Sequence, residues 1–262
     1  MVKNNNKKNN GTNALRGLLA FLVALAVFLG VELIPQLTEN LGSDNHPSYT
    51  ESSDIYEGSY KSRLSLDDIA PFAGEPYIVV NDNVPFFTEA DITTEPFELF
   101  SELDDLGRCG TAYANVCQEL MPTEKRGSIG MVKPSGWQLA KYDFVDGKYL
   151  YNRCHLLGYQ LTGENANVKN LITGTRYLNV TGMLPFENEI ANYVHETNNH
   201  VLYRVTPVFE GDNLVANGVL MEALSVEDDT IEFCVFCYNV QPGVKIDYGT
   251  GLNWADAEYS AN

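Results

Sequence analysis

The sequence predicts an α+β fold with an antiparallel sheet core, and three observations support this fold class. Short apolar or alternating segments separated by turn residues indicate several strands, most of them in the C-terminal third. One segment, Leu184 to Asn199, has helical character and carries Pro185 in its first turn. The helix lies between groups of strands instead of alternating with them, and no internal repeat is visible, which indicates segregated helices and strands.

The elements follow in order along the chain. Two apolar runs around Asn81 to Asn83 predict a hairpin over Pro76 to Phe87, and the spacing over Phe97 to Leu106 predicts a short helix. Gly127 to Gly136 is expected to form a loop, and Lys148 to His155 a strand that ends in polar residues. Asn165 to Asn170 is expected to be a turn or loop. Three strands should then form a meander after the helix: His200 to Pro207, Leu214 to Ser225 and Thr230 to Val240.

The chain is expected to divide into residues 1–37, residues 38–65 and a folded domain over residues 66–262. The first part combines lysines and Arg16 with an apolar run from Leu18 to Val31, which is typical of a signal peptide or membrane anchor and not of a buried core helix. No small-residue cleavage site follows the run, so an uncleaved anchor with its basic end inside is favoured. The polar second part reads as a tether. The domain is therefore expected to be extracellular, either secreted or held at the outer face of the membrane.

Five cysteines leave one unpaired if the others pair, and export would place them where disulfides can form. Cys109 and Cys117 are close enough in sequence to suggest a local bridge. Cys234 and Cys237 have the spacing of a redox or zinc half-site. They lie in an apolar, strand-like run with no second Cys/His pair nearby, so burial as small apolar side chains is the favoured interpretation.

The net charge of −18 argues against a general basic surface for nucleic acid. The charge is unevenly distributed, however. The segment from Met121 to Thr181 carries eight lysines and arginines against four acidic residues, so its net charge is +4 and that of the remainder is −22. A local positive segment in an acidic protein suits a phosphate-containing substrate that must be bound and released.

The residues with the clearest chemical meaning lie in Asn152 to Gly158, Lys169 to Thr173 and Tyr177 to Glu187. Side chains alternate along a strand, so Arg153 and His155 should share one face, where a base and a phosphate contact would lie together. Asn179, at the start of the helix, offers an oxygen to a magnesium-type cation. Glu187 follows about two helical turns later and should point to nearly the same side.

These segments resemble the DNA/RNA non-specific endonucleases of the ββα-metal, or His-Me finger, class, most closely the secreted streptococcal-type DNases and DNA-entry nucleases. The similarity covers roughly Met121 to Gly251 and includes Thr123 to Ser128, Leu202 to Pro207 and Tyr238 to Gly243. The family motif is D-R-G-H. Here Asn152 replaces the aspartate, as is familiar in the streptococcal branch, and Cys154 replaces the glycine.

The resemblance implies a ββα-metal catalytic unit that hydrolyses phosphodiesters with one Mg²⁺, for which Mn²⁺ could substitute. His155 matches the general base, Asn179 the direct metal ligand and Glu187 the acid that orients the waters of the cation, with Glu196 as the substitute if the helix is placed differently. A water deprotonated by His155 would attack the phosphorus, leaving 5′-phosphate products. Arg153, Lys125, Arg126 and Arg176 would contact backbone phosphates, with Asn152 and Asn170 in support. DNA is the expected substrate, and the sequence leaves RNA open.

Each of these residues also has an ordinary interpretation. A histidine after a strand can be structural, Asn179 can be a helix cap, and the pair Lys125 and Arg126 can be solvated. His195 and His200 are expected to interact with the C-terminal end of the helix. Two other functions remain open: an inactive, exported DNA-binding module, and a zinc or redox protein built on Cys234 and Cys237. The presence of both His155 and Asn179 argues for the enzyme.

Overall fold

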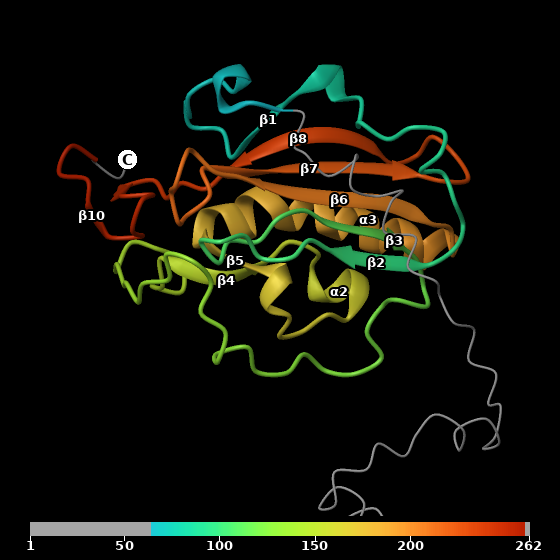
Figure 1. Cartoon of the computed structure of the whole chain (residues 1–262), viewed down its shortest axis with the longest axis horizontal. Coiled ribbons are helices and arrows are strands. Elements are labelled where there is room, and N and C mark those ends of the chain that lie inside the picture. Colours follow the sequence, from blue (N-terminus) through green and yellow to red (C-terminus); the bar gives the residue numbers. More distant parts are fainter. Residues whose placement is uncertain (1–63, 260–262) are drawn as a thin grey trace, which may run out of the picture. The chain divides into compact units, whose positions relative to one another are not determined.

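An antiparallel sheet of six strands forms the centre of the computed structural model, which describes residues 64–259 (Figure 1). Neighbouring strands follow the order β1-β8-β7-β6-β3-β2. The three long strands β6, β7 and β8 form the predicted meander, because each pairs antiparallel with the next, although the strand predicted from Leu214 begins only at Gly218. The strands are β1 (Tyr77–Val79), β2 (Phe97–Phe100), β3 (Ala112–Val116), β6 (Val201–Val208), β7 (Gly218–Ser225) and β8 (Glu232–Tyr238).

Both faces of this sheet are buried. Alternate residues of the strands, such as Val201, Tyr203 and Val205 of β6, pack in one apolar cluster with Ile190 and Val194 of helix α3 (Leu184–Thr197). The opposite face packs against the chain that precedes and follows β1, in a second cluster that contains Val80, Leu220 and Phe236. The two-residue period of the strands therefore produces two separate cores, one on each face of the sheet.

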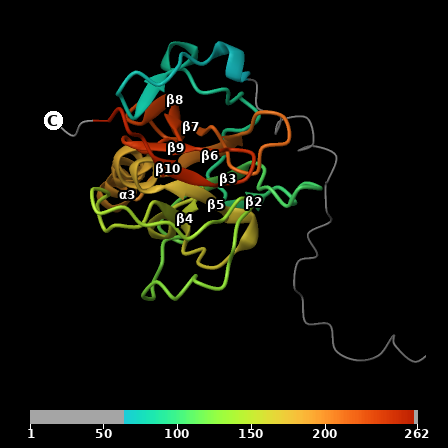
Figure 2. The same ribbon diagram turned by 90° about the vertical axis from the view of Figure 1, so that its left-hand side faces the viewer.

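A second structural unit joins two strands to α3 on the first face. Strands β4 (Tyr151–His155) and β5 (Leu171–Thr175) pair antiparallel, and π-helix η4 (Leu178–Met183) leads from β5 directly into α3 (Figure 2). Between the two strands lie α2 (Tyr159–Thr162) and the 3-10 helix η3 (Val168–Asn170). This strand-strand-helix arrangement confirms the predicted ββα unit and the α+β fold class.

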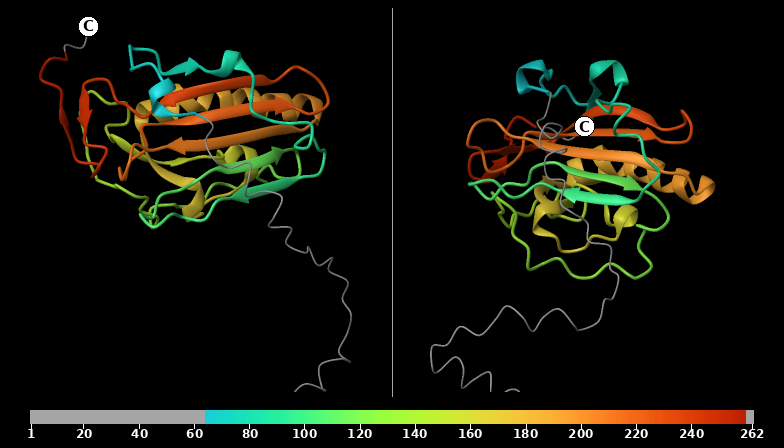
Figure 3. Two further views of the ribbon diagram at one scale, coloured as in Figure 1. Left: turned by 45° about the horizontal axis from the view of Figure 1, so that its top comes forward. Right: turned by 45° about the vertical axis from the view of Figure 1, so that its right-hand side comes forward.

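The remaining elements lie at the periphery. Strands β9 (Val244–Ile246) and β10 (Asn253–Ala255) pair antiparallel near the C-terminal end of the described chain (Figure 3). Two 3-10 helices, η1 (Leu66–Asp68) and η2 (Asn81–Asn83), belong to the segment that covers the second face of the sheet. The predicted strand over Lys148 to His155 begins only at Tyr151, because Gly147 and Lys148 both have positive φ and form a turn.

Two local predictions were wrong. Pro76 to Phe87 does not form a hairpin. Asn81, Asp82 and Asn83 all have positive φ and form η2. Strand β1 pairs with β8 and not with the apolar residues that follow η2. Phe97 to Leu106 is no helix: its first four residues form β2, which pairs with β3. In both cases pairing with a strand far away in the sequence overrides the local pattern.

The expected bridge between Cys109 and Cys117 was also wrong. All five cysteines are free thiols. The five residues of β3 lie between these two, and an extended strand of that length separates its ends by roughly 16 Å, more than a disulfide can span. Cys234 and Cys237 are buried as expected, and they lie in different apolar cores on opposite faces of the sheet. The alternative interpretation, in which Cys234 and Cys237 form a redox or zinc half-site, is therefore wrong.

The predicted signal or anchor and most of the predicted tether lie outside the described residues. Within residues 64–259, none of the helices has the length and apolar character needed to cross a membrane.

Candidate active site

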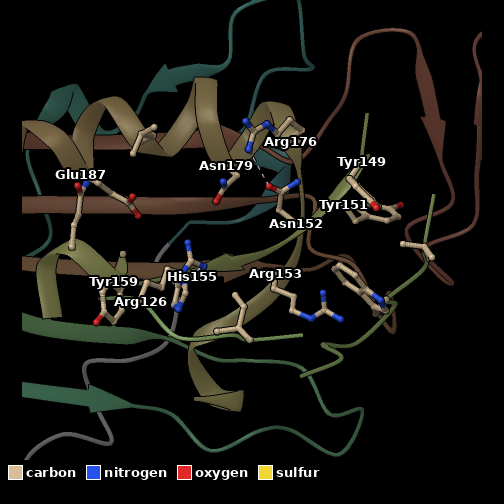
Figure 4. A pocket seen from close by; sticks show the side chains of 16 residues that line it. Arg126, Tyr149, Tyr151, Asn152, Arg153, His155, Tyr159, Arg176, Asn179 and Glu187 are labelled. Atoms are coloured by element: carbon tan, nitrogen blue, oxygen red, sulfur yellow. Dashed lines mark hydrogen bonds between the residues drawn. The ribbon is translucent and has the colours of Figure 1, made fainter. Parts of the chain in front are cut away.

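A pocket of about 760 Å³ opens at the ββα unit. Strand β4 contributes Asn152, Arg153 and His155, and the helical side contributes Asn179 and Glu187, which reach into the pocket opposite His155 and Arg126 (Figure 4). Trp137 from the loop before β4, Gly158 and Tyr159 at the start of α2, and Arg176 directly after β5 complete the walls. The structure therefore brings together the histidine, the amide and the carboxylate that the sequence singled out.

The hydrogen bonds of His155 determine which ring nitrogen carries the proton. Nε2 lies 2.8 Å from the backbone oxygen of Asn165, which can only accept, so Nε2 donates. Nδ1 lies 3.2 Å from Nη2 of Arg126, which can only donate, so Nδ1 accepts. The imidazole is thus oriented with its basic lone pair on Nδ1, beside an arginine of the same pocket.

Burial lowers the pKa of His155 to about 4, and the positive charge of Arg126 acts in the same direction. The Asn165 carbonyl partly opposes both effects by accepting from the ring. The neutral form therefore predominates at every pH well above 4. A neutral, oriented imidazole is what a general base requires.

Asn179 lies in the π-helical turn that precedes α3. Thr175, the last residue of β5, starts this turn by accepting a hydrogen bond from the backbone N–H of Leu178 at 2.9 Å. The Asn179 side chain is held by Cys154, whose thiol donates to Oδ1 at 3.1 Å. Isolated π-helical turns occur often at functional sites, and here the turn presents an amide oxygen to the pocket.

Glu187 lies in the first turn of α3 and is only 8% exposed. Burial raises the pKa of its carboxyl group to about 8, and the charge of Arg126 opposes this only in part. No hydrogen bond or ion pair connects this carboxyl group to another of the described residues. Gly158 lies directly against it, because a Cβ at that position would be 2.8 Å from the carboxyl carbon.

We expect Gly158→Ala to reduce activity strongly while leaving the fold intact. The backbone of Gly158 has φ −57°, which alanine adopts readily, so the cost arises from the contact with the Glu187 carboxyl group alone. Turnover should be measured beside the far-UV circular dichroism spectrum. Gly130→Ala is the matched control, since its added Cβ would approach only Ser128, at 3.8 Å. Equal turnover in both variants would contradict the proposed packing of Gly158 on Glu187.

The donor set of the pocket fits a hard divalent cation. Asn179 offers an amide oxygen, and Glu187 offers a buried carboxylate that has no cationic partner in contact. Oxygen donors of this kind are preferred by magnesium, which binds few protein ligands and keeps several waters. A nearby cation favours the ionised form of a carboxyl group that burial would keep protonated, so Glu187 can then accept hydrogen bonds from the waters of the cation.

The predicted basic residues differ in their surroundings. Arg126 lines the pocket, whereas Lys125 is exposed outside it. Arg176 also lines the pocket, but it forms an ion pair with Asp146 at 2.8 Å. Arg153 donates to the backbone oxygens of Val132 and Gly130 and stacks on Trp137. Its guanidinium therefore holds the preceding loop, which the sequence did not predict.

The supporting residues also separate into two groups. Asn152 lines the pocket and accepts from Arg176 at 3.4 Å, as Figure 4 shows. Asn170 is fully buried away from it and clamps the chain after β4 through both backbone groups of Leu157. Glu196 is exposed near the end of α3 and does not line the pocket, so Glu187 is the candidate acid.

Comparison with known proteins decides the family. A model of the DNA/RNA non-specific endonuclease family matches residues 89–227, more than half of the chain. The chain belongs to this family. A deoxyribonuclease of Streptococcus dysgalactiae subsp. equisimilis is 32% identical over an alignment of 108 residues, with coverage of 39% of this chain and 32% of that relative. The match to this relative thus spans about a third of its length.

Solved structures of endonucleases agree with the family assignment. The crystal structure of NucA from Streptococcus agalactiae with a magnesium ion bound is 26% identical, with a TM-score of 0.61 over 68% of this chain and 86% of NucA. The Sda1 nuclease with a bound zinc ion is 25% identical, with a TM-score of 0.58 over 70% of this chain and 97% of Sda1. The resemblance to streptococcal-type DNases is thereby confirmed.

Sequence reasoning missed three features of this endonuclease-family site. The carbonyl of Asn165 and the contact of Arg126 with His155 depend on a loop conformation that no local pattern encodes. Gly158 was part of the recognised segment, but its packing on Glu187 joins two elements distant in sequence. The glycine three residues after the motif histidine is the one signal in the sequence that pointed to a close approach.

Proposed function

We propose that the protein is an exported, metal-dependent endonuclease that hydrolyses phosphodiester bonds of DNA with little sequence specificity. One observation carries the proposal: the unprotonated Nδ1 of His155 faces a pocket whose opposite wall holds Asn179 and Glu187. A base and oxygen ligands for a cation thus share one cavity. RNA is a second candidate substrate, and the same cleavage assay with RNA in place of DNA tests it.

His155 acts as the general base in this proposal. When the guanidinium of Arg126 turns from Nδ1 to the phosphate, Nδ1 is free to accept a proton from the attacking water, while Nε2 keeps its hydrogen bond to the carbonyl of Asn165. That carbonyl stabilises the imidazolium that forms, because it accepts from the ring in both protonation states. Attack on the phosphorus with departure of the 3′ oxygen leaves 5′-phosphate ends.

Asn179 would bind the cation directly and Glu187 would orient its waters, and we propose that the cation is Mg²⁺ with Mn²⁺ as a substitute. When bound, the cation would stabilise the negative charge that develops on the phosphate and the leaving oxygen. NucA is described with magnesium and Sda1 with zinc, which supports a divalent cation in this family. The oxygen-only donor set favours magnesium here.

Arg126 is the residue best placed to contact the scissile phosphate, because its guanidinium lies beside Nδ1 of His155. Lys125 would contact the flanking backbone. Arg176 would contribute less charge, since Asp146 already pairs with it. Contacts to phosphates carry little information about the bases, so cutting should tolerate many sequences.

The basic, apolar start of the sequence supports export to the cell exterior, with the apolar run as a membrane anchor if it is not removed. Sequencing the N-terminus of the mature protein, together with cell fractionation, tests this part. A new terminus between Gly30 and Tyr60 would rule out the anchor.

The activity itself is tested with the purified protein on plasmid DNA. We expect degradation with added Mg²⁺ or Mn²⁺, 5′-phosphate ends on the products, and no cutting in excess chelator. Equal cutting in chelator would refute the metal-dependent mechanism, and binding without cutting under every metal condition would favour the inactive DNA-binding module.

The low pKa of His155 predicts activity on the acid side of neutrality. The neutral base is present above a pKa of about 4 and is lost as the pH falls through that value. At saturating cation, the acid limb of kcat/KM should therefore lie well below the roughly 6.5 of an ordinary histidine. Arg126→Gln removes one cause of the lowered pKa of His155, so the acid limb of kcat/KM for this variant should move to higher pH. A wild-type limb near 6.5, or no movement in the variant, would contradict this environment for His155.

A further inference from the structure

A second cluster of metal-binding side chains lies outside the pocket, where two strands of the central sheet begin and end. Cys117 follows the last residue of β3, and His200 precedes the first residue of β6. The two strands pair antiparallel with Val116 opposite Val201, so the next residues of each strand are also neighbours. A turn closed by the Leu120 N–H and the Cys117 carbonyl at 3.2 Å brings Glu119 back to the same place.

The three side chains offer one sulfur, one carboxylate oxygen and one ring nitrogen within 4.8 Å of one another. In a tetrahedral zinc site such atoms lie about 3.5 Å apart, given metal-to-ligand distances of roughly 2.0 to 2.3 Å. The required closure is small, and the exposed Glu119 carboxylate already accepts a hydrogen bond from the Cys117 thiol, whose proton a cation would replace. The thiol is buried and the imidazole half-buried, so a cation would enter from the Glu119 side and could keep a water there.

A fourth residue orients the histidine. The Glu227 carboxylate accepts from the His200 backbone N–H at 2.9 Å and lies 2.6 Å from Nδ1. This contact directs the Nδ1 proton toward Glu227 and leaves Nε2 as the ring nitrogen for a cation. A carboxylate that holds the second nitrogen of a ligating histidine is the usual outer partner in zinc sites. The sequence suggested His200 as a partner of the α3 terminus, and the structure instead pairs it with Glu227.

We infer that Cys117, Glu119 and His200 form a binding site for one zinc-type divalent cation, separate from the active-site pocket. Thiolate and imidazole ligands select zinc or a similar borderline metal over magnesium. The site lies beyond the C-terminal end of α3, whereas Glu187 is in its first turn, and the rise from Glu187 to Thr197 is roughly 15 Å of helix. A bound cation would fasten the end of β3 to the start of β6 and stabilise the folded domain.

Cobalt(II), as a spectroscopic substitute for zinc, tests the site in the full-length protein. We expect one equivalent to produce a thiolate-to-cobalt charge-transfer band that zinc displaces. Cys117→Ser should abolish the band. Cys154→Ser is the matched control, because Cys154 is the cysteine next to Asn179, and it should keep the band. Loss in Cys154→Ser with retention in Cys117→Ser would assign the band to the active site and overturn the inference.

Equilibrium dialysis with zinc supplies a second measurement that does not depend on the fold of the cysteine variant. The Asn179→Ala substitution weakens cation binding in the active-site pocket, so this variant should still bind one zinc per chain at the second site. Glu227→Gln should weaken this binding by on the order of 10–100-fold, and Glu119→Gln, which alters a direct ligand at an exposed position, should weaken it more. His195→Gln, an exposed histidine outside the cluster, should not. Absence of bound zinc in the Asn179→Ala protein, or unchanged affinity in both glutamate variants, would overturn the site.

Discussion

Replacing His155 with alanine should reduce turnover by a factor on the order of 10²–10⁴, the contribution typical of general-base catalysis. The substitution removes Nδ1, the unprotonated nitrogen that faces the pocket, while Asn179 and Glu187 stay in place. DNA affinity should therefore change little. Single-turnover cleavage at saturating cation measures the chemical step directly, and a filter-binding or fluorescence assay without cleavage measures affinity.

The cavity left by the imidazole gives this prediction a specific check. Imidazole from solution should restore part of the rate, because it can occupy the space and accept the proton. His195→Ala is the matched control, since His195 is exposed on the last turn of α3, and it should have wild-type turnover. Wild-type turnover in His155→Ala would remove this histidine from the mechanism.

Replacing Asn179 with alanine should reduce activity by weakening cation binding, whereas the His155 substitution removes the proton acceptor. The change removes an oxygen ligand from the cavity but leaves His155 with both of its hydrogen bonds. Apparent affinity for Mg²⁺ should fall by more than the roughly 10–100-fold that is typical for loss of an outer partner of a metal ligand. Activity should respond to higher Mg²⁺, and imidazole should give no rescue.

A titration of activity against Mg²⁺ concentration tests this prediction. Asn192→Ala, an exposed asparagine on α3, serves as the control and should follow the wild-type curve. Unchanged metal dependence in Asn179→Ala would contradict the assignment of the ligand. Glu187→Gln should be milder than Asn179→Ala, because we place Glu187 around the waters of the cation.

Cys154 departs from the family motif, and the structure accommodates this residue without disturbing the arrangement of the pocket. It replaces the glycine of D-R-G-H, and its side chain fills the space beside Gly174, where an added Cβ would lie 2.6 Å from the Cβ of Cys154. Its thiol donates to Asn179, and burial raises its pKa well above the usual value, so it remains a neutral donor. A buried glycine on one strand thus accommodates the larger residue on its neighbour.

The sequence alone determined the fold class, the meander β6 to β8 and helix α3, and it singled out three residues that line the pocket. These features have strong local signals. Three apolar strands with polar turns, a helix with Pro185 near its start, and the ordered set His155, Asn179 and Glu187 are each readable within a short window. The family resemblance depended on the same segments, and for that reason it agreed with the fold and with the family match.

The tertiary structure alone decided the features that depend on contacts between distant segments. Strand β2 and the pairing of β1 with β8 depend on partners far away in the sequence, which local spacing does not show. The tautomer and low pKa of His155 depend on burial and on Arg126 and Asn165. The approach of Cys117 to His200 depends on the register of β3 with β6. Local patterns fix the type of an element, whereas burial and strand register fix which side chains meet and how they ionise.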